Sequence, residues 1–176
     1  IRLLTTVGGL PPLKGNRLEL IPETPDFLAR LAADIDGAER CCHLLYYIWS
    51  PEGRTNLVAE ALIRAVSRGV TCRVLVDAVG SRPFLESDVC RNMRKAGVHV
   101  LPALSVNPIR MLFARIDLRN HRKIAVIDEK IGYTGSHNLA EANFAERTKP
   151  RAGDWVDASV RVEGPAVGAL EAVFLG

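Results

Sequence analysis

The chain has 176 residues, of which 48% are hydrophobic and 24% are charged. This is the composition of an ordinary soluble globular protein, and the length suffices for one domain with a sizeable core. The net charge of +3 is too small to identify a partner by itself. No stretch approaches the roughly 20 apolar residues of a membrane span, and no signal-peptide pattern is present.

The four cysteines do not form a disulfide scaffold, because none of them belongs to a C-x-x-C pair. Cys41, Cys42 and Cys72 lie beside apolar runs that resemble strands. We therefore expect buried free thiols, as in a protein of a reducing compartment.

The first two thirds of the chain alternate between strand and helix patterns. Residues 1–16, rich in glycine and proline, are expected to form an entry segment before one domain over residues 17–176. Thr24 and Pro25 open a helical pattern as N-cap and first helical residue. The elements that follow are a strand at 41–49, a helix at 57–69, a strand at 70–81, a helix at 86–97 and a strand at 98–102. This order predicts an α/β fold with a mixed, largely parallel β-sheet flanked by helices.

The last third of the chain predicts a hairpin, a strand and a final helix. Residues 123–128 alternate in character, Glu129-Lys130 marks a turn, and "IGYTG" returns as a second strand. A strand is expected over 154–164, followed by a helix with Val167, Leu170 and Phe174 on one face. The chain stops there without a helix cap, so we expect it to be part of a longer protein.

A basic segment precedes the hairpin. Five cations and a single acid, Asp117, fall within fourteen residues; the cations are Arg110, Arg115, Arg119, Arg122 and Lys123. Such a segment is typical of a site for an anionic substrate, and a solvated positive face is an equally good interpretation on charge alone.

The stretch "NHRKIAVIDEKIGYTGSHNLA" carries the strongest functional signal. Its pattern is His121-x-Lys123-x4-Asp128-x6-Gly135-Ser136-x-Asn138. If the chain is extended here, His121 and Lys123 lie about 6–7 Å apart on one face, and the hairpin return brings Ser136 and Asn138 close to them. An imidazole, an ammonium, a hydroxyl and an amide can bind a phosphate and supply one nucleophile. Each residue alone is commonplace on a protein surface, and only their conjunction indicates a site.

This motif matches the signature of the phospholipase D superfamily. Over roughly residues 16–176 the chain resembles bacterial cardiolipin synthases, in their first catalytic half; segments such as "HLLYYIW", "RNHRKIAVID" and "WVDASVRVEGPAV" occur in the same order. The resemblance implies a phosphatidyltransferase that makes cardiolipin from phosphatidylglycerol through a phosphohistidine intermediate. It implies His121 as nucleophile or general acid, phosphate binding by Lys123 and Asn138, and support from Ser136.

The resemblance also implies partners and a location. The expected substrate is an anionic phospholipid, phosphatidylglycerol, and no cofactor or metal is expected. A second phospholipase D-like half would complete the site, either in the same chain or from a symmetric dimer mate. The complete protein would work at a membrane surface, on the cytoplasmic side of the bacterial inner membrane. These 176 residues alone are expected to be soluble and inactive.

Two aspartates are further candidates. Asp128 belongs to the motif, but under strand alternation it faces away from Lys123, which favours a structural role. Asp157 is the candidate acceptor for the second ring nitrogen of His121, because a nucleophilic imidazole needs its orientation fixed. A surface acid is the alternative for Asp157. Asp77, at the end of a strand, is expected either to approach the site or to cap a turn.

The other histidines are not expected to take part in chemistry. His137 should point away from its motif neighbours, and His43 and His99 are interpreted as core histidines.

Two alternative functions remain open. One is a phosphodiesterase or endonuclease that acts as a homodimer, and only then would nucleic acid be a partner. The other is a module that binds or supports without catalysis, against which the complete motif argues.

Overall fold

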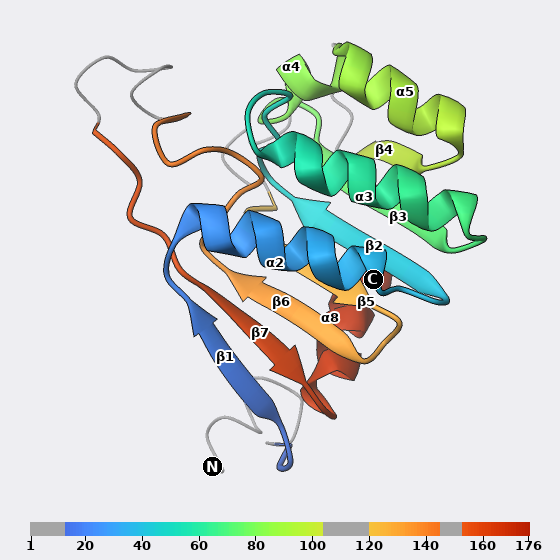
Figure 1. The fold of residues 1–176 in the computed structure, drawn as a ribbon. Coiled ribbons are helices and arrows are strands. Elements are labelled where there is room, and N and C mark those ends of the chain that lie inside the picture. The colour runs from blue at the N-terminus through green and yellow to red at the C-terminus, as the bar shows by residue number, and fades with distance from the viewer. Residues whose placement is uncertain (1–12, 104–119, 145–152) are drawn as a thin grey trace, which may run out of the picture.

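The computed structural model describes residues 13–103, 120–144 and 153–176. Within these residues, seven strands form one mixed sheet in the order β1-β7-β6-β5-β2-β3-β4 (Figure 1). The strands are β1 (Arg17–Ile21), β2 (Cys41–Tyr46), β3 (Thr71–Asp77), β4 (His99–Ala103), β5 (Ile124–Ile127), β6 (Ile131–Gly135) and β7 (Ser159–Glu163). The described helices are α2 (Thr24–Asp36), α3 (Thr55–Ser67), α4 (Arg82–Leu85), α5 (Asp88–Ala96) and α8 (Ala166–Leu175).

The α/β class, the mixed sheet and the flanking helices are confirmed. Among the named strands of the described residues, however, only β2–β3 and β3–β4 pair in parallel. The other four pairings are antiparallel, so the sheet is not largely parallel. The reason is local: β5 and β6 are joined by a tight hairpin, which permits only antiparallel pairing, and this hairpin sits in the middle of the sheet.

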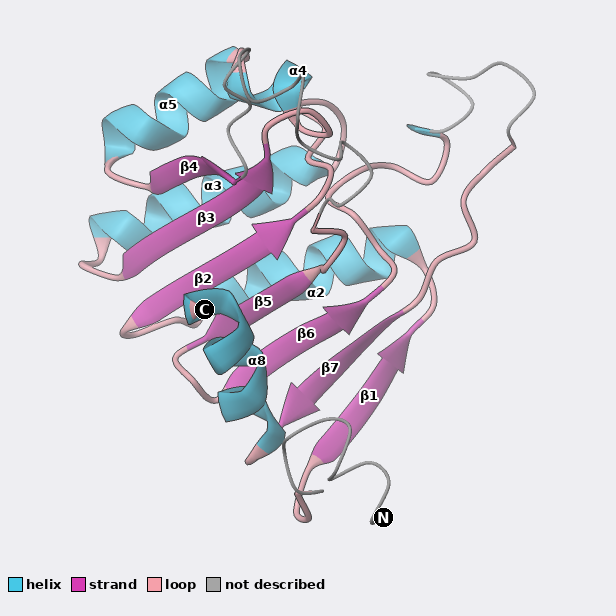
Figure 2. Ribbon diagram, turned by 180° about the vertical axis from the view of Figure 1, so that it is seen from behind, coloured by secondary structure: helices cyan, strands magenta, loops and turns pink. Residues whose placement is uncertain are grey.

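Helices cover both faces of the sheet. Helices α2, α3 and α5 lie over one face, and α8 lies over the other (Figures 1 and 2). The apolar side of α2 faces the sheet, with Phe27, Leu28 and Leu31 almost completely buried. Its N-cap is Glu23, one residue before the predicted Thr24, because Thr24 already has helical geometry. One-residue differences of this kind are normal at helix ends.

The face under α8 carries a small core of its own. Its buried members are Leu45, Ile124, Val126, Val162, Val167 and Phe174. Gly132 makes room for the helix, since a Cβ at this position would lie 2.7 Å from Leu170 Cδ1. Val167 and Phe174 are buried as the predicted helical face requires.

His43 also lies beneath α8 and is a satisfied core histidine, as predicted. Its Nδ1 is 2.6 Å from Glu171 Oε1, its Nε2 is 2.9 Å from Arg73 Nη1, and its ring stacks on Phe174. His99, by contrast, is exposed, so its interpretation as a core residue is wrong. It lies on β4, an edge strand of the sheet.

The cysteines are free, as predicted. Cys42, Cys72 and Cys90 are buried, and Cys41 is half-buried.

One end of the sheet collects most of the motif residues. Strands β1, β2, β3, β4 and β6 end there, and β5 and β7 begin there, as the arrowheads in Figure 2 show. A continuous cross-strand row, Leu45–Ile124–Thr134–Val160, borders this end. We call it the site edge.

Candidate active site

The register of the sheet brings distant segments together at the site edge. Tyr47 lies two residues beyond Leu45, and Lys123 directly precedes Ile124, which pairs with Leu45. Ser136 follows two residues after Thr134, the partner of Ile124 on the other side. Because these residues extend from one row in the same direction, the loop after β2, the entry to β5 and the exit from β6 meet here.

His121 and Lys123 lie just before β5, which begins only at Ile124. The sequence pattern predicted that His121 and Lys123 share one face of a strand, but both residues lie outside the strand. Instead, the Lys123 ammonium donates a hydrogen bond to the His121 carbonyl over 2.6 Å. The His121 imidazole is exposed and stacks on the ring of Tyr47, with 4.0 Å between centroids and 20° between planes.

Tyr47 is a site residue that the sequence pattern did not identify. Besides stacking on His121, its ring lies 5.9 Å from the Lys123 ammonium, within the range of a weak cation–π interaction. Gly80 makes room for it, since a Cβ there would come 2.6 Å from the Tyr47 carbonyl and 3.2 Å from its ring. The Ser81 hydroxyl donates to the same carbonyl over 3.0 Å. The sequence placed Tyr47 inside the strand predicted over 41–49, whereas β2 ends at Tyr46, so no sequence signal marked it as a site residue.

Asn138 is joined to the same loop. Its Oδ1 accepts a hydrogen bond from the backbone N–H of Ile48 over 3.1 Å, and Leu139 N–H donates to the Ile48 carbonyl over 3.0 Å. His121 and Asn138 therefore contact adjacent residues, Tyr47 and Ile48, which places them in one small region. With Oδ1 engaged, the side-chain NH₂ of Asn138 is its donor toward an anion.

Ser136 and Gly135 tie β6 to the start of β7. Ser136 N–H donates to the Ala158 carbonyl over 2.9 Å, and Ala158 N–H donates to Ser136 Oγ over 3.0 Å. Gly135 is required here because a Cβ would lie 2.3 Å from the Ala158 carbonyl oxygen and 2.6 Å from Ser159 Cα. Ser136 itself is exposed at the site edge.

Asp157 lies outside β7, since the strand predicted from residue 154 begins only at Ser159. The neighbouring strands β1 and β6 both end opposite Ser159, so the preceding residues have no strand to pair with. Among the described residues no hydrogen bond joins Asp157 to His121. Burial lowers the pKa of both Lys123 and His137, and the charge of Asp157 opposes each shift in part.

Lys123 is half-buried, and this affects its charge. Burial lowers the pKa of the Lys123 ammonium below its usual value, and the carboxylate of Asp157 opposes that shift in part. A desolvated cation binds an anion more strongly than one in bulk water. Lys123 is thus suited to neutralise a phosphate group.

His137, which the sequence pattern left out of the site, is buried in the core. It is 1% exposed, stacks on Phe27, and its Nδ1 lies 3.0 Å from Ser159 Oγ. Burial lowers the pKa of this imidazole, and Asp157 and Glu23 raise it in part. This enclosed imidazole supports the packing of β7.

Asp128 lies at the opposite end of β5 from Lys123. Its carboxylate accepts three backbone N–H groups, from Glu39, Arg40 and Cys41, at 2.7–2.9 Å. It thereby fixes the entry of β2 beside the hairpin turn, where Asp128 and Glu129 both have positive φ. This geometry supports the structural role expected from strand alternation.

Asp77 caps a turn, which is one of its two expected roles. Its Oδ1 accepts the N–H groups of Val79 and Gly80 over 2.9 and 2.8 Å. The carboxylate thus shapes the turn that seats Tyr47. The basic residues Arg110, Arg115 and Arg119 lie outside the described residues.

The described residues contain no group of three or more His, Cys, Asp or Glu side chains that could hold a metal ion. Within the same part of the chain, no helix is long and apolar enough to cross a membrane. What the site edge does gather is a stacked imidazole, an ammonium, a hydroxyl and an amide donor. This set can bind a phosphate and present a nitrogen nucleophile to it.

Solved structures with the same fold exist. NucT from Helicobacter pylori superposes with a TM-score of 0.66 at 14% sequence identity, over 92% of this chain and 94% of that one. A phospholipase D family member, Nuc from Salmonella typhimurium, gives a TM-score of 0.58 at 17% identity, over 92% of this chain and 91% of that one. At these identities the likeness concerns the fold.

Sequence comparison is more specific. Cardiolipin synthase A from Yersinia pseudotuberculosis serotype O:1b is 42% identical over 166 residues, and so is the protein of that name from Yersinia pestis bv. Antiqua (strain Angola). These matches cover 94% of this chain, which spans only 34% of the length of either relative. Residues 31–149 match the family model for "Cardiolipin synthase, PLD-like domain". The chain therefore belongs to the phospholipase D-like domain family of cardiolipin synthase.

Proposed function

We propose that this chain is a catalytic half of a phospholipase D-type phosphatidyltransferase that forms cardiolipin from phosphatidylglycerol. The observation that carries the proposal is the complete motif, whose His121, Lys123, Ser136 and Asn138 all lie at the site edge. The 42% identity to cardiolipin synthase A supports the choice of substrate class.

In the proposed reaction, a ring nitrogen of His121 attacks the phosphorus of phosphatidylglycerol. The N–P bond forms as the P–O bond to glycerol breaks, and the departing alkoxide takes a proton from an acid. The hydroxyl of a second phosphatidylglycerol then attacks the phosphohistidine, loses its proton to the same group, and releases free His121 with cardiolipin.

The chain's own residues would stabilise these steps. Lys123 and the Asn138 NH₂ donate to the phosphate oxygens, on which negative charge develops. Tyr47 holds the imidazole plane through stacking. Ser136 keeps the exit of β6 joined to the entry of β7. Since the substrate is a lipid, the reaction takes place at a membrane surface.

The acid comes from a second phospholipase D-like half, in the same protein or in a symmetric dimer mate. His43 does not qualify, because it is buried beneath α8, where it contacts Glu171 and stacks on Phe174. His137 is enclosed by Phe27 and Ser159.

The test is to replace His121 by alanine in the full-length protein and to measure cardiolipin formation from phosphatidylglycerol. We expect turnover to be abolished, and Lys123→Ala to lower it by roughly 10²–10³-fold, the usual loss when a transition-state contact is removed. His99→Ala is the matched control, an exposed histidine on edge strand β4. More than about a tenth of the activity remaining in His121→Ala would refute the role of His121.

The alternative, a homodimeric phosphodiesterase or endonuclease, has one observation in its favour. This chain covers 94% and 91% of the solved NucT and Nuc chains, so a protein of this length can match a whole chain of the fold. Two measurements on the purified 176-residue chain distinguish the two functions. One is its activity on phosphatidylglycerol and on a generic phosphodiester, and the other is its mass in solution. An inactive monomer supports the two-half synthase, and an active dimer supports the alternative.

A further inference from the structure

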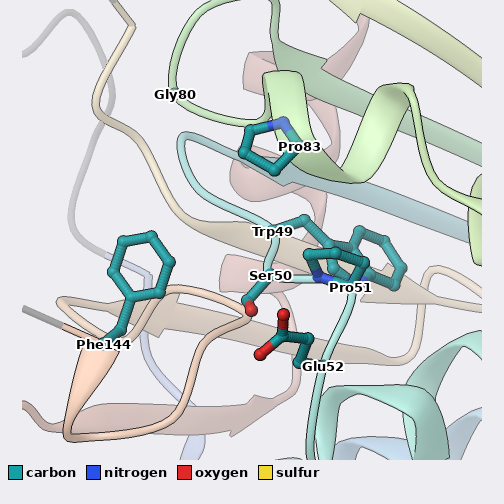
Figure 3. Close-up of a pocket in the computed structure, with 7 residues that line it drawn as sticks. All are labelled: Trp49, Ser50, Pro51, Glu52, Gly80, Pro83 and Phe144. Atoms are coloured by element: carbon teal, nitrogen blue, oxygen red, sulfur yellow. The ribbon is translucent and has the colours of Figure 1, made fainter. Parts of the chain in front are cut away.

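A hollow of about 260 Å³ lies among the segments that extend from the site edge (Figure 3). It is built by the segments that follow β2, β3 and β6, the second of which includes Pro83 of α4. Its lining residues are Trp49, Ser50, Pro51, Glu52, Gly80, Pro83 and Phe144. Since all three segments leave from the site edge, the hollow lies on the same side of the sheet's end as His121.

Tyr47 connects the hollow to the motif. On one hand the Tyr47 ring stacks on His121 at 4.0 Å. On the other it packs against Gly80, which lines the hollow, so closely that a Cβ at Gly80 would be 3.2 Å from the ring. A group in the hollow and a phosphate at Lys123 could therefore belong to one substrate molecule.

The loop after β2 is held in place before any ligand binds. Ser50 N–H donates to the Leu139 carbonyl over 2.7 Å, and Thr55 Oγ1 donates to the carbonyls of Ser50 and Glu52 over 2.7 and 2.8 Å. The N–H of Arg54 donates to Glu141 Oε1 over 2.6 Å. Such a fixed wall lowers the entropic cost of binding.

The opposite wall is also supported. Phe144 lies against Trp155, with 5.5 Å between ring centroids, and Trp155 N–H donates to the Ala142 carbonyl over 2.9 Å. The segment before β7 therefore packs against the segment after β6 and fixes the position of Phe144.

The lining combines apolar walls with two oxygen-bearing side chains. Pro51, Pro83 and Phe144 offer carbon surfaces, while the Ser50 hydroxyl and the Glu52 carboxylate point toward the same space (Figure 3). A carboxylate repels a phosphate but accepts hydrogen bonds from hydroxyl groups. The volume is below the roughly 300–1,000 Å³ of sites for drug-sized ligands, which indicates a small group.

We propose that this hollow, the alcohol pocket, binds the polyol part of the substrate, a glycerol-type vicinal diol, while Lys123 and Asn138 hold the phosphate. The proposal rests on the proposed function. The C–H faces of the diol pack on Pro51, Pro83 and Phe144, and its hydroxyls donate to Glu52 and Ser50. The division follows from hydrogen bonding, since Lys123 and Asn138 donate to phosphate oxygens, and the oxygens of Ser50 and Glu52 accept from hydroxyl groups.

The experiment measures acceptor choice by the full-length protein. Phosphatidylglycerol in mixed micelles is the phosphatidyl donor, and isotopically labelled glycerol and 1-propanol compete as acceptors. The readout is the ratio of labelled phosphatidylglycerol to phosphatidylpropanol. Because 1-propanol has no second hydroxyl, removal of the hydrogen-bond acceptors Ser50 and Glu52 should lower transfer to glycerol alone.

We expect Glu52→Gln to lower this ratio about tenfold, a typical effect of removing a charged hydrogen-bond partner of a substrate hydroxyl. Ser50→Ala should lower it less. Glu60→Gln, an exposed acid on α3, is the matched control and should leave it unchanged. An unchanged ratio in Glu52→Gln would overturn the proposal, since a residue with only a structural role alters both products equally.

A second measurement tests the proposal if the Glu52→Gln protein transfers the phosphatidyl group to neither acceptor. Binding of glycerol to the full-length protein, followed by ligand-observed NMR, should weaken in Glu52→Gln, and equal binding in both proteins would overturn the proposal. If the unaltered protein transfers to no alcohol at all, the proposed function fails instead. With phosphatidylglycerol as acceptor, a parallel loss of cardiolipin formation would show that the lipid headgroup enters the same pocket as free glycerol.

Discussion

The imidazole of His121 stacks on the phenol ring of Tyr47, 4.0 Å from centroid to centroid, and this contact joins two segments 74 positions apart in the chain. Gly80 leaves room for the ring of Tyr47, and the Ser81 hydroxyl donates a hydrogen bond to the Tyr47 backbone carbonyl. The nucleophile proposed for the reaction is therefore oriented by an aromatic face.

Replacing Tyr47 tests this orientation. We expect Tyr47→Ala to lower kcat/KM for phosphatidyl transfer by up to about tenfold, since aromatic stacking contributes roughly 0.5–1.5 kcal/mol. Tyr47→Phe keeps the ring and should retain nearly full activity. Steady-state kinetics of the two variants in the full-length protein check this, and equal activity of Tyr47→Ala and the unaltered protein would exclude a positioning role.

Asp157 should control the pH dependence through Lys123. The Lys123 ammonium must be protonated to bind phosphate, so activity is lost as the pH rises through its pKa. Burial lowers that pKa and the charge of Asp157 raises it, so Asp157→Asn should move the alkaline limb of the kcat/KM profile to lower pH. A profile that falls uniformly at every pH would instead indicate that Asp157 orients His121.

Asp128→Asn should destabilise the fold with little effect on turnover per folded molecule. Removing the charge weakens bonds to three backbone N–H groups, which should cost about 1–3 kcal/mol. Chemical denaturation of both proteins gives the difference. Glu129→Gln, at an exposed neighbour, is the control, with an expected change within about 0.5 kcal/mol.

The effect of Asp128 should also depend on pH. Burial by itself raises the pKa of the Asp128 carboxyl, but the three N–H donors outweigh it and hold the pKa below its usual value. A carboxyl with a lowered folded-state pKa stabilises the protein above its unfolded pKa of about 3.9, and this stabilisation is lost as the pH falls through the folded-state pKa. The stabilities of the unaltered protein and Asp128→Asn should therefore converge only in acid.

Gly135→Ala should separate β6 from the entry of β7 at the site edge. Its Cβ would lie 2.3 Å from the Ala158 carbonyl oxygen, so the backbone must shift, at a cost of about 1–3 kcal/mol. Activity should fall as well, because Ser136 is the next residue. Gly168→Ala, in α8 with no atom within 4 Å of the new Cβ, should instead stabilise by about 0.5–1 kcal/mol. Thermal unfolding of both variants provides the comparison.

Transfer should not require a divalent metal. The groups at the site edge are hydrogen-bond donors and a cation, with Lys123 in the role that a metal plays in other phosphoryl-transfer sites. Activity of the full-length protein with excess chelator should equal that without it. Loss of activity that Mg²⁺ restores would contradict the proposed phosphohistidine route.

The sequence by itself determined most of the elements and the motif. Periodicity placed α2, α3, α5 and α8, because apolar residues repeat along one helical face, and the apolar runs placed β2 and β3. It did not indicate β1, a five-residue edge strand whose side chains are mostly exposed and which therefore lacks a buried pattern. The spacing of the motif, together with its resemblance to the phospholipase D signature, selected His121, Lys123, Ser136 and Asn138.

Only the tertiary structure decided what surrounds these residues. The central hairpin made most of the sheet antiparallel, and long-range register, which no local pattern records, brought Tyr47 against His121 and Ile48 against Asn138. The lack of strand partners beyond Ser159 placed Asp157 in a loop, where its charge reaches Lys123. Local sequence thus determines which chemical groups are present, and pairing between distant strands determines which residues lie next to them.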